Sequence, residues 1–289
     1  MTTYVNWNGQ LRTEQEPIIA THDRGYLLGD GLFETMRYYG DLPIKSPLRC
    51  FDLHWQRLMK SAALLQLNLS ITSAQLAEHI IATLSANQLQ HQSARIRITI
   101  SRGVGQSGLL PDISLPSTIL ITTHAFQANL TPFRLMIATT RRNEHSVSAK
   151  IKSLSYIDNV LARLEAEQHQ ADEAILCNSK GHIASTSYHT LFAVLKGQII
   201  TPPIHDGALP GIARQIILDL AHKKSLPLYE QTLYPQDLLD CDELFLSNSL
   251  HGIRAVNQLN QRPLTTHDWT KKITDYYTQW LHDEHATVC

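Results

Sequence analysis

The chain has 289 residues, with 25 basic and 26 acidic side chains and a formal net charge of −1. At roughly 150 residues per domain, this length predicts two domains. Such a balance of charge argues against a nucleic-acid or membrane-surface protein, because these usually carry a basic face. Hydrophobic residues make up 43% of the chain and charged residues 18%. A chain of this size can bury its core without disulfides or a metal, and long disordered arms are not expected.

Cellular location is suggested by what the sequence lacks. The first residues have no basic head before an apolar core, so no signal peptide is expected. The longest stretch without Asp, Glu, Lys or Arg, residues 113–133, contains two prolines and several polar residues and is a poor membrane span. Cys50, Cys177, Cys241 and Cys289 form no CxxC pair, which favours free thiols in a reducing compartment. We expect a soluble cytoplasmic enzyme with a small-molecule substrate and no nucleic-acid or membrane partner.

Hydrophobic periodicity predicts strands and two helices in the first part of the chain. Asn8-Gly9 is a typical two-residue hairpin turn. Arg95, Arg97 and Thr99 alternate with isoleucines, as in a half-buried strand. The other expected elements are a strand over 32–39, helices over 52–65 and 74–84, the second capped by Thr72, and strands over 95–101 and 117–123.

The pattern changes at residues 124–132, which we interpret as a linker between domains 1–123 and 133–289. The second domain is expected to be the larger. Its expected elements are strands over 133–140, 173–177, 244–246 and 253–256, a hairpin over 191–200, a helix over 154–169 and a helix after Pro210. Strands mixed with helices but without a regular βαβ rhythm predict an α+β (mixed α/β) fold.

Two motifs that suggest cofactors or metals are weak here. Gly103-Val104-Gly105-Gln106-Ser107-Gly108 matches GxGxxG, but prolines and a strand follow it where a dinucleotide site needs a helix and a later acid. We interpret it as a flexible loop. The chain has 15 histidines but no HExxH motif, and His282-Asp283-Glu284-His285 lies in a tail expected to fray. No metal site is therefore predicted.

Two other features point to chemistry. Leu209-Pro210-Gly211 opens an expected helix, and the unpaired amides after such a glycine can hold a phosphate, although proline is also common there for structural reasons. Lys152 follows an expected strand, and a desolvated amine there could attack an aldehyde. An isolated lysine is more often a solvated surface residue. Lys150 shares the expected strand face, so spacing alone does not choose between the two.

Taken together, ordered motifs make the chain resemble the class IV aminotransferase family, the fold-type IV enzymes that use pyridoxal 5′-phosphate (PLP). The similarity covers about residues 4–259. The motifs are His22-Asp23-Arg24-Gly25, Gly29-Asp30-Gly31-Leu32-Phe33-Glu34-Thr35, His54-Trp55-Gln56-Arg57-Leu58, Ile100-Ser101-Arg102-Gly103, Ile151-Lys152-Ser153-Leu154, Asn159-Val160-Leu161-Ala162, Ala171-Asp172-Glu173-Ala174-Ile175-Leu176, Thr201-Pro202-Pro203, Leu209-Pro210-Gly211-Ile212 and Ser247-Asn248-Ser249.

This resemblance implies the two-domain fold of the D-amino-acid aminotransferases and their relatives, a homodimer, and PLP held between the domains. Lys152 aligns with the lysine that attaches the cofactor and moves the proton, whereas Lys150 does not. Arg57 would hold the phosphate, for which a guanidinium is suited. The phosphate cradle would be completed by the amides of Ile212 and Ala213, with Ser249 and Asn248.

Within the family, the chain looks most like 4-amino-4-deoxychorismate lyase, which releases pyruvate to give 4-aminobenzoate for folate synthesis. The Ser-Arg-Gly-x-Gly run and the Asn-Ser pair carry this likeness, and Phe33 and Arg102 are the candidate substrate-binding residues. The loop 103–111 lacks the arginine and histidine that D-amino-acid aminotransferases tend to carry. Aminotransfer on D-amino or branched-chain amino acids is the alternative.

One departure affects the expected chemistry. The family has a glutamate beside the pyridine nitrogen and an asparagine five residues later, where this chain has Ser185 and Thr190. A carboxylate keeps that nitrogen protonated and the ring electron-poor, and a hydroxyl does so less well. Ala213 also stands where the family often has a hydroxyl residue. Weakened or lost activity, leaving a binding protein, is therefore a third possibility.

Overall fold

The structure is a computed structural model that describes residues 2–283, and its contacts divide the chain into two units. Unit 1 is Met1–Gln127 with Lys152–Ser155, and unit 2 is Ala128–Ile151 with Tyr156–Cys289. The first change of unit falls inside the stretch 124–132 that the sequence marked as a linker, although its first two residues still belong to a strand. The segment that contains Lys152 belongs to unit 1, whereas the sequence reading placed it in the C-terminal domain.

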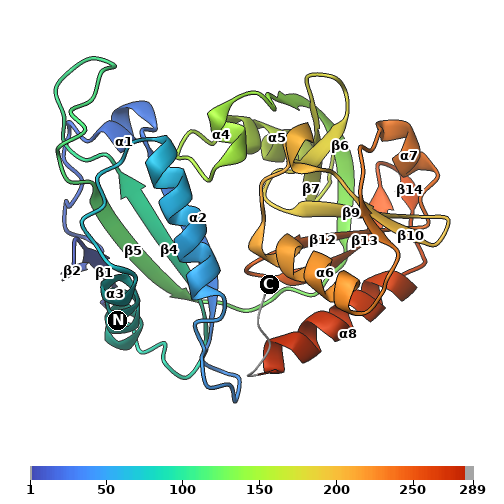
Figure 1. The fold of residues 1–289 in the computed structure, drawn as a ribbon, viewed down its shortest axis with the longest axis horizontal. Helices are drawn as coiled ribbons and strands as arrows, with labels where there is room; N and C mark the ends of the chain where they lie inside the picture. Colours follow the sequence, from blue (N-terminus) through green and yellow to red (C-terminus); the bar gives the residue numbers. More distant parts are fainter. Residues whose placement is uncertain (1, 284–289) are drawn as a thin grey trace. The chain divides into compact units, whose positions relative to one another are not determined.

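Unit 1 is built on a five-stranded antiparallel sheet in the order β2-β1-β5-β4-β3 (Figure 1). The strands are β1 (Tyr4–Trp7), β2 (Gln10–Thr13), β3 (Gly31–Tyr39), β4 (Ser93–Ser101) and β5 (Thr118–Ala125). The predicted hairpin turn is confirmed: Asn8 and Gly9 have φ values of 50° and 86°, and both being positive suits the tight turn between β1 and β2. The predicted strands over 32–39, 95–101 and 117–123 are confirmed as well.

Helices cover one face of this sheet. Even-numbered residues such as Met36, Ile96 and Ile98 share one face by register and are almost fully buried, since side chains alternate along a strand. The helices of unit 1 are α1 (Arg24–Leu28), α2 (Phe51–Leu64) and α3 (Ser73–Ala86). The predicted cap of α3 is confirmed, because the Thr72 side chain accepts from the amide of Gln75 in a capping box.

Residues 152–154 extend the sheet of unit 1 at its β3 edge. The amide of Phe33 donates to the carbonyl of Lys152 (2.8 Å), and the amide of Leu154 donates to the carbonyl of Gly31 (3.0 Å). Leu32 pairs with Ser153 in an antiparallel bridge. This pairing satisfies backbone groups that the edge of a sheet otherwise leaves open. It also points the Lys152 side chain to the same face as Phe33.

Unit 2 contains a nine-stranded mixed sheet, in the order β11-β10-β9-β12-β13-β6-β7-β8 with β14 paired to β13. β6 runs parallel to both β7 and β13, and the other pairs except β10-β11 are antiparallel. The strands are β6 (Phe133–Arg142), β7 (Glu173–Asn178), β8 (Ile183–Thr186), β9 (Thr190–Leu195), β10 (Gln198–Thr201), β11 (Leu228–Glu230), β12 (Glu243–Asn248), β13 (Gly252–Leu259) and β14 (Arg262–Pro263).

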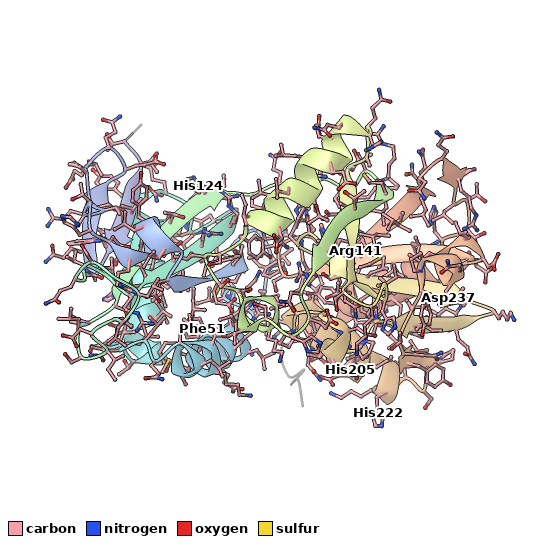
Figure 2. All side chains as sticks on the ribbon, turned by 90° about the horizontal axis from the view of Figure 1, so that it is seen from above. Phe51, His124, Arg141, His205, His222 and Asp237 are labelled. Carbon is pink, nitrogen blue, oxygen red and sulfur yellow. The ribbon has the colours of Figure 1, made fainter. Side chains whose placement is uncertain are left out.

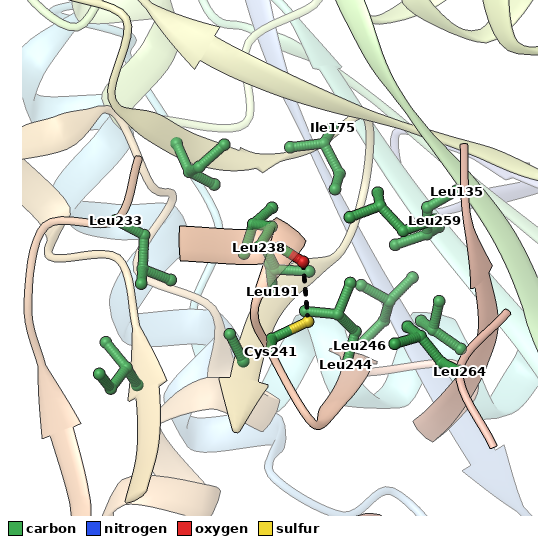
Figure 3. Packing of buried hydrophobic residues seen from close by; sticks show 14 of the residues in the cluster. Leu135, Ile175, Leu191, Leu233, Leu238, Cys241, Leu244, Leu246, Leu259 and Leu264 are labelled. Carbon is green, nitrogen blue, oxygen red and sulfur yellow. Dashed lines mark hydrogen bonds between the residues drawn. The ribbon is translucent and has the colours of Figure 1, made fainter. Parts of the chain in front are cut away.

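The two faces of this sheet bury different sets of residues. One face carries the main core of leucines, isoleucines and Cys241, whose thiol donates to the carbonyl of Leu238 (Figure 3). On the other face, small side chains such as Ala138 and Ala174 pack against Ala162 and Ala166 of α5. The helices of unit 2 are α4 (Val147–Lys150), α5 (Ile157–Gln168), η1 (Ile204–Asp206), α6 (Ile212–Lys223), α7 (Pro235–Leu239) and α8 (Asp268–His282).

The predicted mixed α/β fold is confirmed, and so are the predicted strands, hairpin and helices of unit 2, with two local errors. The helix expected over 154–169 begins only at Ile157, because Leu154 pairs with Gly31 instead. The interpretation of Lys150 as sharing a strand face with Lys152 was wrong, because Lys150 ends the short helix α4. Its N-cap Ser146 starts that turn of helix after β6. No helix of the described chain is long and apolar enough to cross a membrane. Glu284 and His285 of the histidine-rich tail lie outside the described residues.

Candidate active site

Lys152 lies beside an aromatic ring on the sheet of unit 1. Its Nζ is 4.5 Å from the centroid of the Phe33 ring, and the Arg97 guanidinium carbon is 4.1 Å from the same centroid. Both distances allow a cation–π interaction. The register puts Phe33 opposite Thr99 and Thr35 opposite Arg97. Lys152, Phe33 and Arg97 therefore share the face of the sheet opposite to α2.

On the α2 side of β3, a buried glutamate binds a histidine and an arginine. Glu34 accepts two hydrogen bonds from Arg57, from Nε (2.8 Å) and from Nη2 (2.8 Å), and its Oε2 lies 2.8 Å from Nδ1 of His54. His54 and Arg57 are three residues apart on α2, so they point to the same side of the helix. This bidentate geometry fixes the plane of the Arg57 guanidinium.

Burial, neighbouring charges and hydrogen bonds together set the pKa values of Glu34 and His54. Burial alone would raise the pKa of Glu34, but the charge of Arg57 and the hydrogen bond from His54 outweigh it and hold that pKa well below its usual value. Burial lowers the pKa of His54 despite its contact with Glu34, with Arg57 and Lys152 acting in the same direction. The cluster is therefore a carboxylate paired with a guanidinium, with a neutral imidazole at its side.

Arg102, predicted to bind substrate, is bound by other groups of unit 1. Its Nε and Nη2 donate to the carboxylate of Asp30 (2.7 and 3.0 Å), and its Nη1 and Nη2 donate to the carbonyls of Gln66 and Leu65. Arg24 donates to Asp30 as well, at 3.0 Å. Burial would raise the pKa of Asp30, but the hydrogen bonds from both arginines outweigh it and lower that pKa. A substrate role for Arg102 stays a prediction, and its contacts here tie the start of β3 to the end of α2.

The glycine-rich loop after β4 is held by Arg24 alone of these two arginines. Arg24 donates from Nη1 to the carbonyl of Gly108 (2.7 Å) and from Nη2 to that of Leu109 (2.9 Å). No helix begins in this loop, and the next element is β5. A dinucleotide site of the GxGxxG type needs a helix at this point, and this loop leads into a strand instead.

In unit 2, Ser185 lies on β8 beside a loop organised by a second buried glutamate. The Ser185 hydroxyl donates to the carbonyl of Thr186 (2.8 Å). Glu173 accepts from the hydroxyl of Ser187 (2.5 Å) and from the amides of Ala174 and Ser187, and its Oε2 lies 3.0 Å from Nδ1 of His189. Glu173 thus holds the loop that follows Ser185 in one conformation.

The N-terminus of α6 offers donors without a side-chain cap. Gly211 is the N-cap and makes no side-chain hydrogen bond, and Ile212 and Ala213 form the first turn. The first amides of a helix have no partner within it and carry the positive end of its dipole. A Cβ added at Gly211 would come within 3.2 Å of the Thr190 hydroxyl oxygen. Glycine therefore keeps space open beside Thr190, and this helix start suits an anion.

Asn248 and Ser249 stand where β12 ends. The Asn248 side chain accepts from the amides of Leu250 (3.0 Å) and His251 (2.8 Å), so its carbonyl oxygen shapes this turn. Ser249 is half-buried in the turn itself. The neighbouring Ser247 hydroxyl is buried and has no hydrogen-bond partner among the described residues.

The predicted site residues thus fall into two sets, one in each unit. Phe33, Arg57, Arg102 and Lys152 belong to unit 1. The set in unit 2 consists of Ser185, Ile212, Ala213, Asn248 and Ser249. Sequence reasoning gave no role to Glu34, His54, Arg97, Glu173 or His189. Period-two alternation was a usable signal for Arg97, because it puts residues 95, 97 and 99 on one face.

Comparison with known proteins gives the site its context. The family model described as amino-transferase class IV matches residues 31–259. A protein of Methanocaldococcus jannaschii, provisionally named a branched-chain-amino-acid aminotransferase, is 28% identical over 94% of this chain and 96% of its own. The aminodeoxychorismate lyase of Bacillus subtilis is 26% identical over 88% of this chain and 86% of its own. A Legionella pneumophila crystal structure, provisionally named 4-amino-4-deoxychorismate lyase, superposes with a TM-score of 0.84 at 28% identity, covering 92% of this chain and 96% of the other.

Proposed function

Because the chain belongs to the class IV aminotransferases, we propose that it is a PLP-dependent lyase that converts 4-amino-4-deoxychorismate to 4-aminobenzoate and pyruvate. The observation that carries the proposal is the Lys152 amine beside Phe33 and Arg97 on one face of a sheet. An amine suits an aldehyde cofactor, and an arginine on the same face suits a substrate carboxylate. Similarity to the B. subtilis lyase over most of the chain, with the Ser-Arg-Gly-x-Gly run, supports the lyase reaction.

The residues present fit PLP. Lys152 would attach it, Arg57 and the uncapped amides of Ile212 and Ala213 would hold its phosphate with Asn248 and Ser249, and Ser185 would face the ring nitrogen. The bound cofactor supplies an electron sink for the pair of electrons left when a proton is removed. With its amine free again, Lys152 would take the proton from the substrate carbon that bears the amino group, and would later give a proton to the departing enol of pyruvate.

The cofactor is tested by colour and by trapping. Purified protein mixed with PLP should absorb in the visible, and borohydride reduction should fix the cofactor on the peptide containing Lys152. Lys152→Ala should abolish trapping, whereas Lys150→Ala, which changes the neighbouring lysine on α4, should leave it intact. A colourless protein that ignores PLP would support a non-catalytic protein instead.

The reaction is tested by following both products. Wild-type protein and Lys150→Ala, incubated with aminodeoxychorismate, should release 4-aminobenzoate and pyruvate in equal amounts, and Lys152→Ala should release neither. Rapid amino exchange between an amino acid and a 2-oxo acid, without 4-aminobenzoate, would contradict the lyase and favour an aminotransferase. The match to the M. jannaschii protein makes aminotransfer on D-amino or branched-chain amino acids the second candidate.

Ser185 defines a further test of the chemistry. A hydroxyl holds a proton on the ring nitrogen less well than a carboxylate does. Ser185→Glu should therefore raise the rate of the reaction, with Ser225→Glu, at an exposed position of unit 2, as the control. Equal PLP binding with no gain in rate would contradict the proposed role of the ring nitrogen.

We also propose that the protein forms a homodimer. Support comes from apolar side chains exposed on unit 1: Leu109 and Leu110 are 84% and 91% exposed, and Tyr26 on α1 is 77% exposed. Arg24 binds the loop of Leu109, so these residues belong to one anchored region. Light scattering should give twice the mass of the chain, and Leu109→Ser with Leu110→Ser should weaken the dimer. A monomeric wild-type protein at micromolar concentration would overturn this proposal.

A further inference from the structure

Three basic side chains form a row on the sheet face that carries Phe33 and Arg97. Arg37 on β3 is paired in register with Arg95 on β4, and Arg95 is paired with His124 on β5. Paired residues of neighbouring strands point to the same face and lie about 5 Å apart. Figure 2 labels His124 near the end of β5. Arg37, Arg95 and His124 are called the basic row below.

Carboxylates of unit 1 neutralise the basic row only in part. Arg37 donates to the Ser93 hydroxyl (2.7 Å) and lies over the rings of Tyr39 and Phe126, and its closest carboxylate oxygen is that of Asp41 at 4.0 Å. Arg95 is exposed, and no carboxylate of the described chain pairs with it.

Like charges placed opposite each other across a sheet are destabilising. An anion bound between Arg37 and Arg95 would relieve this repulsion.

The basic row lies one step along the sheet from Arg97. Successive side chains of a strand point to opposite faces of the sheet. Arg95 and Arg97 are therefore neighbours on this face, with their Cα atoms about 7 Å apart. The row of Arg97 contains two hydroxyls, Thr35 and Thr122. Beyond it lies Phe33, which contacts Lys152. The face thus offers, in order, an amine, a first arginine and a second basic group.

We propose that the basic row binds a second carboxylate of the substrate, which makes small dicarboxylates the preferred substrate class. The inference rests on the proposed function, because it takes Lys152 as the reacting centre. Arginine binds carboxylates through paired hydrogen bonds, and Arg95 is exposed enough to turn toward a ligand. Aminodeoxychorismate fits this class, since it carries two carboxylates in addition to its amino group.

The binding test compares two rigid probes, benzoate with one carboxylate and terephthalate with two, titrated calorimetrically into the PLP-loaded protein. Terephthalate should bind the wild type more tightly. Arg95→Gln should weaken terephthalate binding about tenfold, which is about 1.4 kcal/mol, while changing benzoate binding less than about twofold. Arg95→Lys should restore part of the difference. Arg12→Gln, which removes an exposed arginine on β2, serves as the matched control and should change neither probe.

The outcomes separate this inference from the proposed function. Where lyase activity is present, Arg95→Gln should raise KM for aminodeoxychorismate about tenfold and leave kcat within about twofold. An unchanged KM, or terephthalate binding the wild type no better than benzoate, would overturn the carboxylate subsite but not the lyase. A protein without lyase activity that still loses terephthalate binding in Arg95→Gln would overturn the lyase and keep the subsite.

Discussion

Each unit contains a buried glutamate bound to a histidine, and the two pairs are stabilised differently. Glu34 lies 2.8 Å from His54 in unit 1, and Glu173 lies 3.0 Å from His189 in unit 2. Glu34 has the guanidinium of Arg57 as a third member, whereas Glu173 is bound by a hydroxyl and two backbone amides. A buried charge can be compensated by an opposite charge or by dipoles. Removing the carboxylate should therefore lower the free energy of unfolding much more at Glu34 than at Glu173.

The largest expected effect comes from Glu34→Gln. Arg57 would keep its charge in a mostly buried position without a carboxylate, and breaking such a pair costs about 3–5 kcal/mol. The free energy of unfolding, measured with urea at pH 7, should fall by that amount. Glu16→Gln, which removes the exposed partner of Arg12, is the control and should have a much smaller effect. A loss below about 1 kcal/mol for Glu34→Gln would remove the contrast between the pairs.

Acid should reduce stability through the same residue. The pKa of Glu34 in the folded protein lies below its usual value of 4.5. Its contribution to stability is therefore complete above about pH 4.5 and is lost as the pH falls toward the folded pKa. Urea unfolding at several pH values should show a shallower acid decline in Glu34→Gln than in the wild type. Equal declines would mean that other carboxylates dominate the acid response.

Glu173→Gln should cost less, about 1–3 kcal/mol. The amide keeps one acceptor oxygen for Ser187, and no guanidinium loses its partner. Urea unfolding of Glu173→Gln beside Glu34→Gln gives the direct comparison. A larger loss of unfolding free energy in Glu173→Gln than in Glu34→Gln would contradict the predicted order of the two pairs.

The smallest effect is expected from Ser187→Ala, which deletes the 2.5 Å hydrogen bond to Glu173 and leaves the amide donors in place. A loss of about 1 kcal/mol is expected, since one hydrogen bond to a charged group is removed from several. Urea unfolding of Ser187→Ala checks this loss. The control is Ser179→Ala, which deletes a hydroxyl that donates to another carboxylate, that of Glu144. No change at all would indicate that the amides alone hold Glu173.

Local patterns predicted most of the fold, because turns and alternation depend on neighbouring residues. Asn8-Gly9 and the strand over 95–101 are examples. The sequence placed Lys152 at the end of a strand but did not predict that its segment pairs with β3. That pairing depends on hydrogen bonds to residues more than a hundred positions earlier. The same limit applies to Lys150, since the short helix α4 has little periodicity to reveal it.

The site was predicted in outline, through residue types. Lys152 and Arg57 were identified by motif, and their roles stay predictions. The partner of Arg57 could not be predicted, because Glu34 is 23 residues away and meets it only once α2 packs on β3. For Arg102, the motif suggested a bound substrate, but in the structure Asp30 and two carbonyls accept its hydrogen bonds.

The bridge between residues 152–154 and β3 has a consequence for the order of folding. During synthesis the five strands of unit 1 are complete once β5 has emerged, but the β3 edge remains open until the chain has continued through residue 155. An open edge of this kind can pair with another chain. A ribosome-bound fragment ending at Gln127 should therefore associate more readily than one that includes residue 155. In this protein the lysine segment closes a sheet as well as carrying an amine.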